Sequence, residues 1–120
     1  MITDIFLNNL AKAINGESFT LPAYNAFSSS VITVDATDTS LPTEYDRSSA
    51  SGARINNTVT FTSVRSGAIA SSSGDYINSM GLLSSSTVGD LHVEALVPNV
   101  LHTTSFDLEV DWAITIERKG

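Results

Sequence analysis

The sequence contains no cysteine and few basic residues. Without cysteine, disulfide bonds, thiolate catalysis and thiolate-ligated zinc or iron–sulfur sites are excluded. Six lysine and arginine residues stand against 13 aspartate and glutamate residues, which gives a formal net charge of −7 at pH 7. Because nucleic acids and anionic membranes bind positively charged surfaces, we expect neither as a partner.

Long apolar runs are also missing, and charged residues make up only 16% of the chain. No stretch has the roughly 20 apolar residues of a membrane-spanning helix, and residues 1–7 lack the positive segment of a secretory signal. Hydroxyl side chains replace charges, with 18 serine and 13 threonine residues. At 120 residues, 42% of them hydrophobic, the chain is predicted to form one domain over residues 1–120 with a preference for β structure.

Only the N-terminal segment has helical periodicity, which predicts a helix over residues 3–15. Thr3 is suited to cap the N-terminus, and Asn15-Gly16 supplies the left-handed residue that commonly ends a helix. A helix this short is not stable alone, so its apolar face must dock on a sheet of this chain or on a neighbouring subunit. That face is predicted to consist of Leu7, Leu10, Ala11 and Ile14.

After Gly16 the apolar period falls to two residues. Residues 19–27 contain Pro22, which cannot donate to a sheet ladder, so this segment is predicted to be an edge strand or an extended arm. Residues 31–35 are a brief strand candidate. Residues 36–54 are polar and rich in serine, which predicts a long loop.

The β core is predicted over residues 57–118. Strand-like segments at 57–65, 76–83 and 88–97 alternate with serine-rich turns, and the last segment has six successive alternations of apolar and polar residues. This spacing predicts an antiparallel β-sandwich or jelly-roll-like barrel with one short N-terminal α-helix. The apolar residues of the last segment are Phe106, Leu108, Val110, Trp112, Ile114 and Ile116.

Two groups of titratable residues deserve comparison with known sites. Asp107, Glu109 and Asp111 share one face of the last predicted strand and offer oxygen ligands for Ca²⁺, but no EF-hand loop is present, and a solvated acidic face is favoured. His92 and His102 are the only histidines, and two histidines without cysteine make a poor zinc set. We expect outward-facing or subunit-contact histidines, with no catalytic residue, no metal and no cofactor.

The aromatic residues keep a carbohydrate-binding site open as an alternative. Trp112 is in phase with the apolar positions of the last strand, which favours a place in the core or a subunit interface over sugar stacking. The stacking platforms of such a module would be Trp112, Tyr24, Tyr45 and Tyr76.

Three short motifs occur in an order that resembles small virion proteins of tailed phages, a group of head-decoration and tail-fibre-like proteins. Residues 38–47, D-T-S-L-P-T-E-Y-D-R, are similar to that group's D-T-x-L-x-x-E-x-x-R signature, and residues 58–62 match its T-V-T-F strand. Residues 77–83, I-N-S-M-G-L-L, resemble its I-x-E-x-G-L-F segment, with Leu83 in place of the aromatic residue. Residues 23–27, A-Y-N-A-F, replace the group's A-x-G-x-G turn.

The resemblance implies a non-enzymatic structural protein of a virion. It implies a capsid decoration or cement protein that binds the major capsid protein on the outer surface of a phage head as a homo-oligomer, with a trimer favoured. A tail, baseplate or fibre-attachment component, in contact with tail proteins, is the first alternative. A carbohydrate-binding adhesin module is the second.

Within the signature, Leu41 is expected to anchor the loop on the core. Glu44 and Arg47 are expected to pair, either within the loop or across a subunit boundary. The candidates for oligomer or partner contacts are Phe6, Leu7, Leu10, Ile14, Tyr24 and Phe27.

Overall fold

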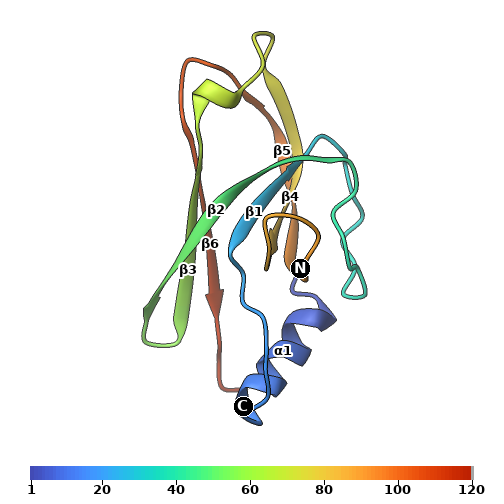
Figure 1. Ribbon diagram of the computed structural model, residues 1–120, viewed down its shortest axis with the longest axis vertical. Helices are drawn as coiled ribbons and strands as arrows, with labels where there is room; N and C mark the ends of the chain where they lie inside the picture. The colour runs from blue at the N-terminus through green and yellow to red at the C-terminus, as the bar shows by residue number, and fades with distance from the viewer. Residues whose placement is uncertain (120) are drawn as a thin grey trace.

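In the computed structural model, which describes residues 1–119, the regular structure consists of one α-helix, six strands and a single 3-10 turn. The elements are α1 (Asp4–Ile14), β1 (Tyr24–Ser28), β2 (Glu44–Ile55), β3 (Thr58–Arg65), the 3-10 turn Gly67–Ile69, β4 (Asp75–Leu83), β5 (Leu91–His102) and β6 (Leu108–Thr115). All six strands join one antiparallel sheet in the order β5-β4-β1-β2-β3-β6 (Figure 1). The outer strands β5 and β6 contact the same apolar cluster, so the sheet is nearly closed into a barrel. The predicted mainly β fold with one short helix is confirmed.

Two apolar clusters fill the interior of the barrel. One surrounds Phe27 of β1 and is packed by side chains of β5 and β6, including Trp112. The second surrounds Leu82 of β4 and is packed by Phe6 of α1 and Phe61 of β3. The alternation predicted for the last strand is confirmed from Leu108 to Ile114, whose apolar side chains face this interior. It is wrong at its two ends, because Phe106 and Ile116 lie outside β6 and are exposed.

The helix α1 lies below the barrel in the view of Figure 1 and begins and ends as predicted. The hydroxyl of Thr3 accepts a hydrogen bond from the Phe6 amide at 3.3 Å, and Gly16 adopts a φ of 71° just beyond the last turn. The predicted apolar face is wrong for three of its four residues, because Leu7, Ala11 and Ile14 are exposed and only Leu10 is half-buried. The face toward the barrel is formed by Phe6, Asn9, Leu10 and Ala13.

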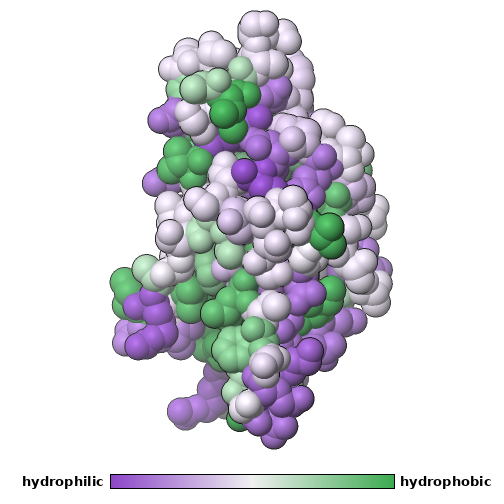
Figure 2. Space-filling model, viewed as in Figure 1, coloured by the Kyte–Doolittle hydropathy of each residue, from purple (hydrophilic) through white to green (hydrophobic). Residues whose placement is uncertain are grey.

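Hydrophobic atoms gather on the lower half of the surface seen in Figure 2, between the β2–β3 hairpin and α1.

The N-terminal residues ahead of the helix cover part of the β5 edge. The Thr3 amide donates to the His92 carbonyl at 3.1 Å, and the Glu94 amide donates to the Met1 carbonyl at 3.0 Å. The helix is therefore fixed to the sheet by its own leading residues.

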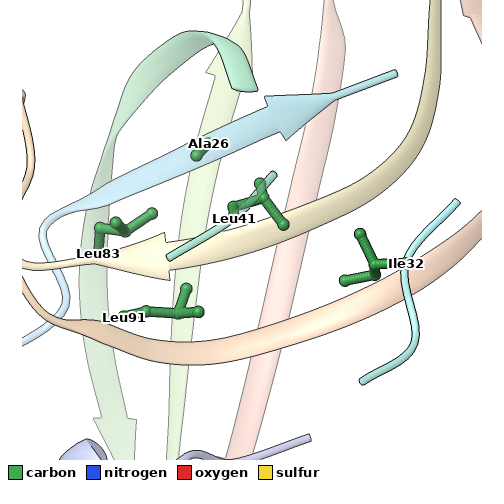
Figure 3. Close-up of a cluster of buried hydrophobic side chains, with 5 residues drawn as sticks. All are labelled: Ala26, Ile32, Leu41, Leu83 and Leu91. Carbon is green, nitrogen blue, oxygen red and sulfur yellow. The ribbon is translucent and has the colours of Figure 1, made fainter. Parts of the chain in front are cut away.

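A third apolar cluster lies on the outer face of the sheet, beneath the loop of residues 29–43. Ile32 and Leu41 of this loop cover Ala26, Leu83 and Leu91 of strands β1, β4 and β5 (Figure 3). The loop therefore shields these apolar side chains on the outside of the barrel from solvent. Residues 31–35 are not a strand, contrary to prediction, because their backbone joins no ladder and the segment is held instead by Ile32 and Val34, whose side chains pack onto the sheet.

The prediction of a loop over residues 36–54 is wrong from Glu44 onward, where β2 begins. This strand has few apolar side chains, and pairing with β1 and β3 on its two sides sets its conformation. Its Gly52 leaves room for Phe61, since a Cβ there would lie 2.9 Å from the aromatic ring. The sheet therefore extends well before the β core predicted at residues 57–118.

Residues 19–27 contain a central strand, not an edge strand. Pro22 lies in the extended arm ahead of β1, so it removes no hydrogen bond from the ladder. Strand β1 pairs with β2 on one side and β4 on the other. The strand predicted at residues 88–97 is displaced along the chain, because β5 begins only at Leu91 and continues to His102.

Candidate functional site

The three residues of the sequence signature make two kinds of contact within the chain, one apolar and one polar. Leu41 is buried in the outer cluster. Glu44 and Arg47 form a two-point ion pair within the chain, in which one guanidinium nitrogen lies 3.0 Å from the carboxylate. Another nitrogen of Arg47 donates to the carbonyls of Ser85 and Val88, at 2.5 and 2.7 Å. Arg47 therefore connects the start of β2 to the loop between β4 and β5.

Strained backbone flanks this ion pair. Thr43 and Val88 have φ values of 53° and 55°, a left-handed conformation that β-branched residues rarely adopt. Thr43 directly precedes Glu44, and the carbonyl of Val88 is one of those bound by Arg47. The ion pair and its carbonyl contacts thus hold two unfavourable backbone conformations in place.

Reversing the charge of Arg47 tests this role. We expect Arg47→Glu to lower the free energy of unfolding by about 2–4 kcal/mol, because two carboxylates then face each other and two carbonyls lose their donor. Urea denaturation measures the loss. The double variant Glu44→Arg/Arg47→Glu restores opposite charges but no donor for the carbonyls, so most of the loss should remain. A double variant as stable as the wild type would show that the carbonyl contacts contribute nothing.

A second polar cluster surrounds Arg65, whose side chain is almost completely buried at the end of β3. Its guanidinium donates to Asp46 and to Asp75, each at 2.9 Å, and to Nδ1 of His102 at 2.6 Å. Burial opposes ionisation of Asp75, but hydrogen bonds from Arg65 and Ser71 outweigh it and lower the pKa of this carboxyl. The cluster joins β2, β3, β4 and β5 through one side chain.

His102 and His92 are both fully buried, so the expectation of outward-facing histidines is wrong. Since Nδ1 of His102 accepts from Arg65, its Nε2 carries the proton and donates to the Phe106 carbonyl at 2.8 Å. His92 packs edge-on against Phe6, and its Nε2 lies 3.3 Å from the Thr20 hydroxyl. Burial lowers the pKa of the His92 imidazole. Both rings act as packing and hydrogen-bonding elements inside the fold.

A buried carboxyl, Glu94, lies beneath the loop of residues 29–43. Its Oε1 accepts from the Asp35 amide at 3.0 Å, and Asp38 accepts from the same amide at 3.2 Å, which brings two carboxyl groups together. Within residues 1–119, Oε2 of Glu94 has no hydrogen-bond partner. Burial, with a further contribution from Asp38, raises the pKa of Glu94 to about 7.

The acidic face of the last strand is used for structural hydrogen bonds. Asp107 accepts from the Gly67 amide at 2.8 Å, and Asp111 accepts from the Thr62 hydroxyl at 2.8 Å. In the part of the chain that the structure describes, no three histidine or acidic residues are placed to hold a metal ion.

The candidate contact residues differ in their accessibility. Phe27 is fully buried in the barrel, so its assignment as a partner contact is wrong. Phe6, Leu10 and Tyr24 are half-buried, and Phe6 belongs to the interior cluster. Leu7 and Ile14 are exposed on the helix. These two residues are the ones whose side chains a partner can reach most freely.

The aromatic residues considered for sugar stacking also differ in their accessibility. Trp112 faces the interior, where its indole N–H donates to the buried Asn25. Tyr45 and Tyr76 are exposed and adjacent, since the Tyr45 hydroxyl donates to the Tyr76 carbonyl at 3.2 Å. One face of the Tyr45 ring is covered by the Arg65 guanidinium, 5.3 Å from the ring centre.

Sequence reasoning missed the Arg65 cluster and Glu94. A usable signal existed for Glu94, which interrupts the apolar run L-H-V-E-A-L-V of residues 91–97. A charged residue inside such a run indicates a buried charge. No comparable local signal marks Asp46 and Asp75, because their partner Arg65 is distant in sequence.

A search for similar proteins among family models, curated proteins and solved structures gave no significant match. Among residues 1–119, no helix combines the length and the apolar character needed to span a bilayer.

Proposed function

We propose that this chain is a non-enzymatic structural protein of a phage-like virion, a decoration or cement protein that binds the major capsid protein on the outer surface of the head. The observation that carries the proposal is the joint role of the signature residues. Leu41 anchors the outer loop, and Glu44 with Arg47 joins β2 to the loop after β4. This gives a structural reason for the D-T-x-L-x-x-E-x-x-R spacing that underlies the resemblance.

The use of the histidines supports a structural role. Both ring nitrogens of His102 are bound within the fold, and His92 is covered by α1 and the arm that follows it. A general base must reach a substrate, and neither ring is accessible in this arrangement. The acidic, hydroxyl-rich surface suits a protein present in many copies on a particle, because like-charged copies remain soluble until assembly.

Quantitative mass spectrometry of purified virions tests the proposal. We expect a copy number close to that of the major capsid protein, or a large fixed fraction of it. A handful of copies per particle would instead place the chain in the tail or baseplate. Absence from the purified particle would contradict the virion proposal altogether.

The adhesin alternative has one specific observation in its favour: Tyr45 and Tyr76 are both exposed, and the Tyr45 hydroxyl reaches the Tyr76 carbonyl. It lacks its principal platform, because Trp112 points into the barrel. We therefore favour the capsid proposal, because it also gives a role to the signature residues Leu41, Glu44 and Arg47.

A further inference from the structure

Strand β6 forms one edge of the sheet and is paired only with β3 (Figure 1). The pairing has no register shift over the whole of Leu108–Thr115. Directly beyond it, the Ile116 amide donates to the Asn57 carbonyl at 2.9 Å. Because residues along an antiparallel strand alternate between facing and leaving the hydrogen-bonded partner, the even-numbered residues of β6 are the ones bonded to β3. The amides and carbonyls of the odd-numbered residues therefore point away from the sheet.

These outward-pointing backbone groups are exposed and unpaired. We define the free edge of β6 as Glu109, Asp111, Ala113 and Thr115. Within residues 1–119, neither the amide nor the carbonyl of any of the four has a hydrogen-bond partner. An unpaired row of backbone donors and acceptors is a template for one further strand.

The opposite edge of the sheet, β5, is protected against such an addition. Its first half is covered by the chain itself, because the Thr3 amide donates to the His92 carbonyl and the Glu94 amide donates to the Met1 carbonyl. Its second half contains Pro98, and the pairing with β4 shifts register around that residue. Proline and register shifts commonly protect sheet edges. In the described part of the chain β6 has neither, so its edge is the one open to a partner strand.

The inner face beside the free edge is apolar. Val110 and Trp112 of β6 belong to the interior cluster around Phe27 but are only half-buried. Val97 and Val100 of β5 pack onto the same cluster and are also half-buried. Since side chains alternate between the two faces of a strand, every second residue of an added strand would lie against this cluster. Apolar side chains at these positions would remove further apolar surface from water.

The outer face beside the free edge is acidic. Glu109 and Asp111 are exposed, and among residues 1–119 neither forms a salt bridge. The residues opposite them on β3, Val64 and Thr62, are uncharged. Lysine or arginine side chains of an added strand would lie beside the two carboxylates, which is a favourable cross-strand pairing. A second copy of this chain would instead bring its own carboxylates, and registers centred on this stretch would place like charges against each other.

We propose that the free edge of β6 binds an extended segment of a partner protein in which apolar residues alternate with lysine or arginine. The segment pairs through its backbone with the odd-numbered residues of β6. Its apolar side chains cover Val110 and Trp112, and its basic side chains face Glu109 and Asp111. The inference rests on the proposed function, since it specifies how the chain holds the capsid protein.

Amide hydrogen exchange followed by NMR tests the backbone pairing, with the acetylated and amidated peptide K-V-K-V-K-V-K as the probe. A peptide of the same composition, with its lysines and valines in separate blocks, is the matched control. With the alternating peptide at roughly ten times its dissociation constant, we expect amide exchange at the free edge to slow by about tenfold. The even-numbered residues of β6 are already bonded to β3 and should change little. The control peptide should leave the free edge unprotected.

Two variants separate the backbone contacts from the charges, and the melting temperature verifies that each variant folds. Ala113→Pro removes one amide of the free edge but no hydrogen bond to β3, so it should weaken binding by about tenfold or more, whereas Ala113→Val keeps the amide and should bind like the wild type. Glu109→Lys/Asp111→Lys should reverse the preference in favour of the peptide E-V-E-V-E-V-E. The control Asp4→Lys/Glu17→Lys makes the same change of net charge at exposed positions around α1 and should retain the preference for the basic peptide.

Three results would overturn the proposal. The first is exchange at the free edge that the alternating peptide does not slow. The second is equal binding of the two lysine peptides, which would mean attraction by net charge alone. The third is protection of the free edge in the chain without peptide that grows with protein concentration, since a second copy would then be the occupant. The peptide measurements need no virion and the copy number on virions needs no peptide, so failure of the edge and failure of the proposed function are distinguishable.

Discussion

Replacing Arg65 by methionine is expected to lower the free energy of unfolding by about 3–5 kcal/mol, because the substitution removes the buried cation that compensates two half-buried carboxylates and bonds the buried His102 ring. Arg65 is the shared donor for Asp46, Asp75 and Nδ1 of His102. Without it, two carboxylates lie close together and a buried ring nitrogen loses its donor. Its guanidinium also lies 5.6 Å from the centre of the Phe27 ring, so the loss extends to packing in the core. Urea denaturation followed by Trp112 fluorescence measures the change.

Two further variants separate the causes of that loss. Arg65→Lys keeps the positive charge, but a single ammonium group cannot bond three partners in three directions, so an intermediate loss is expected. Arg54→Met removes an exposed arginine with one carbonyl contact and should change stability by no more than about 0.5 kcal/mol. A loss below about 1 kcal/mol for Arg65→Met would mean that the cluster relaxes and solvates its carboxylates.

Replacing Glu94 by glutamine is expected to stabilise the protein above neutral pH. The pKa of Glu94 is raised from 4.5 to about 7 in the folded chain, so between these values the unfolded chain releases a proton that the folded chain retains. Stability therefore falls as pH rises through this window, by roughly 3 kcal/mol at about 1.4 kcal/mol per pKa unit, and is constant with respect to this group outside it. Glutamine stays neutral, accepts from the Asp35 amide and can donate to Asp38.

The stability of Glu94→Gln should exceed that of the wild type by about 2–3 kcal/mol at pH 8 and should differ little at pH 4.5. Denaturation curves across this range measure the difference. Glu109→Gln, at an exposed position on β6, is the matched control and should reproduce the wild-type pH profile. A wild-type profile that is flat between pH 4.5 and 8, or one parallel to that of Glu94→Gln, would contradict the assignment of this proton to Glu94.

The elements that could be predicted from the sequence are those whose pattern is local. Thr3 and Gly16 mark the helix ends by capping chemistry, and β6 alternates because one of its faces fills the barrel. Strand β2 could not be predicted, because its side chains are small and polar and its conformation comes from its two neighbours. The central position of β1 in the sheet could not be predicted either. Pro22 indicated an edge strand, but β1 begins two residues later, so the proline lies outside the ladder.

In the polar clusters too, the contacts between residues close in sequence could be predicted and those between distant residues could not. Glu44 and Arg47 are three residues apart, so their pairing follows from the signature spacing, whereas the contacts of Arg47 with Ser85 and Val88 depend on the folded loop. Arg65 meets residues from three other strands, and no spacing along the chain indicates which. Sequence analysis therefore predicts contacts within one segment better than contacts between segments.

The central position of β1 also constrains the order in which the chain can fold. The β2–β3 and β4–β5 pairs each join strands that are consecutive in sequence, so only short loops must close to form them. The five residues of β1 instead pair with Met80 and its neighbours, more than fifty positions away, and such closure carries a larger entropic cost. We therefore expect the two hairpins to form early as separate units, and β1 to insert later, joining them and sealing Phe27 from water.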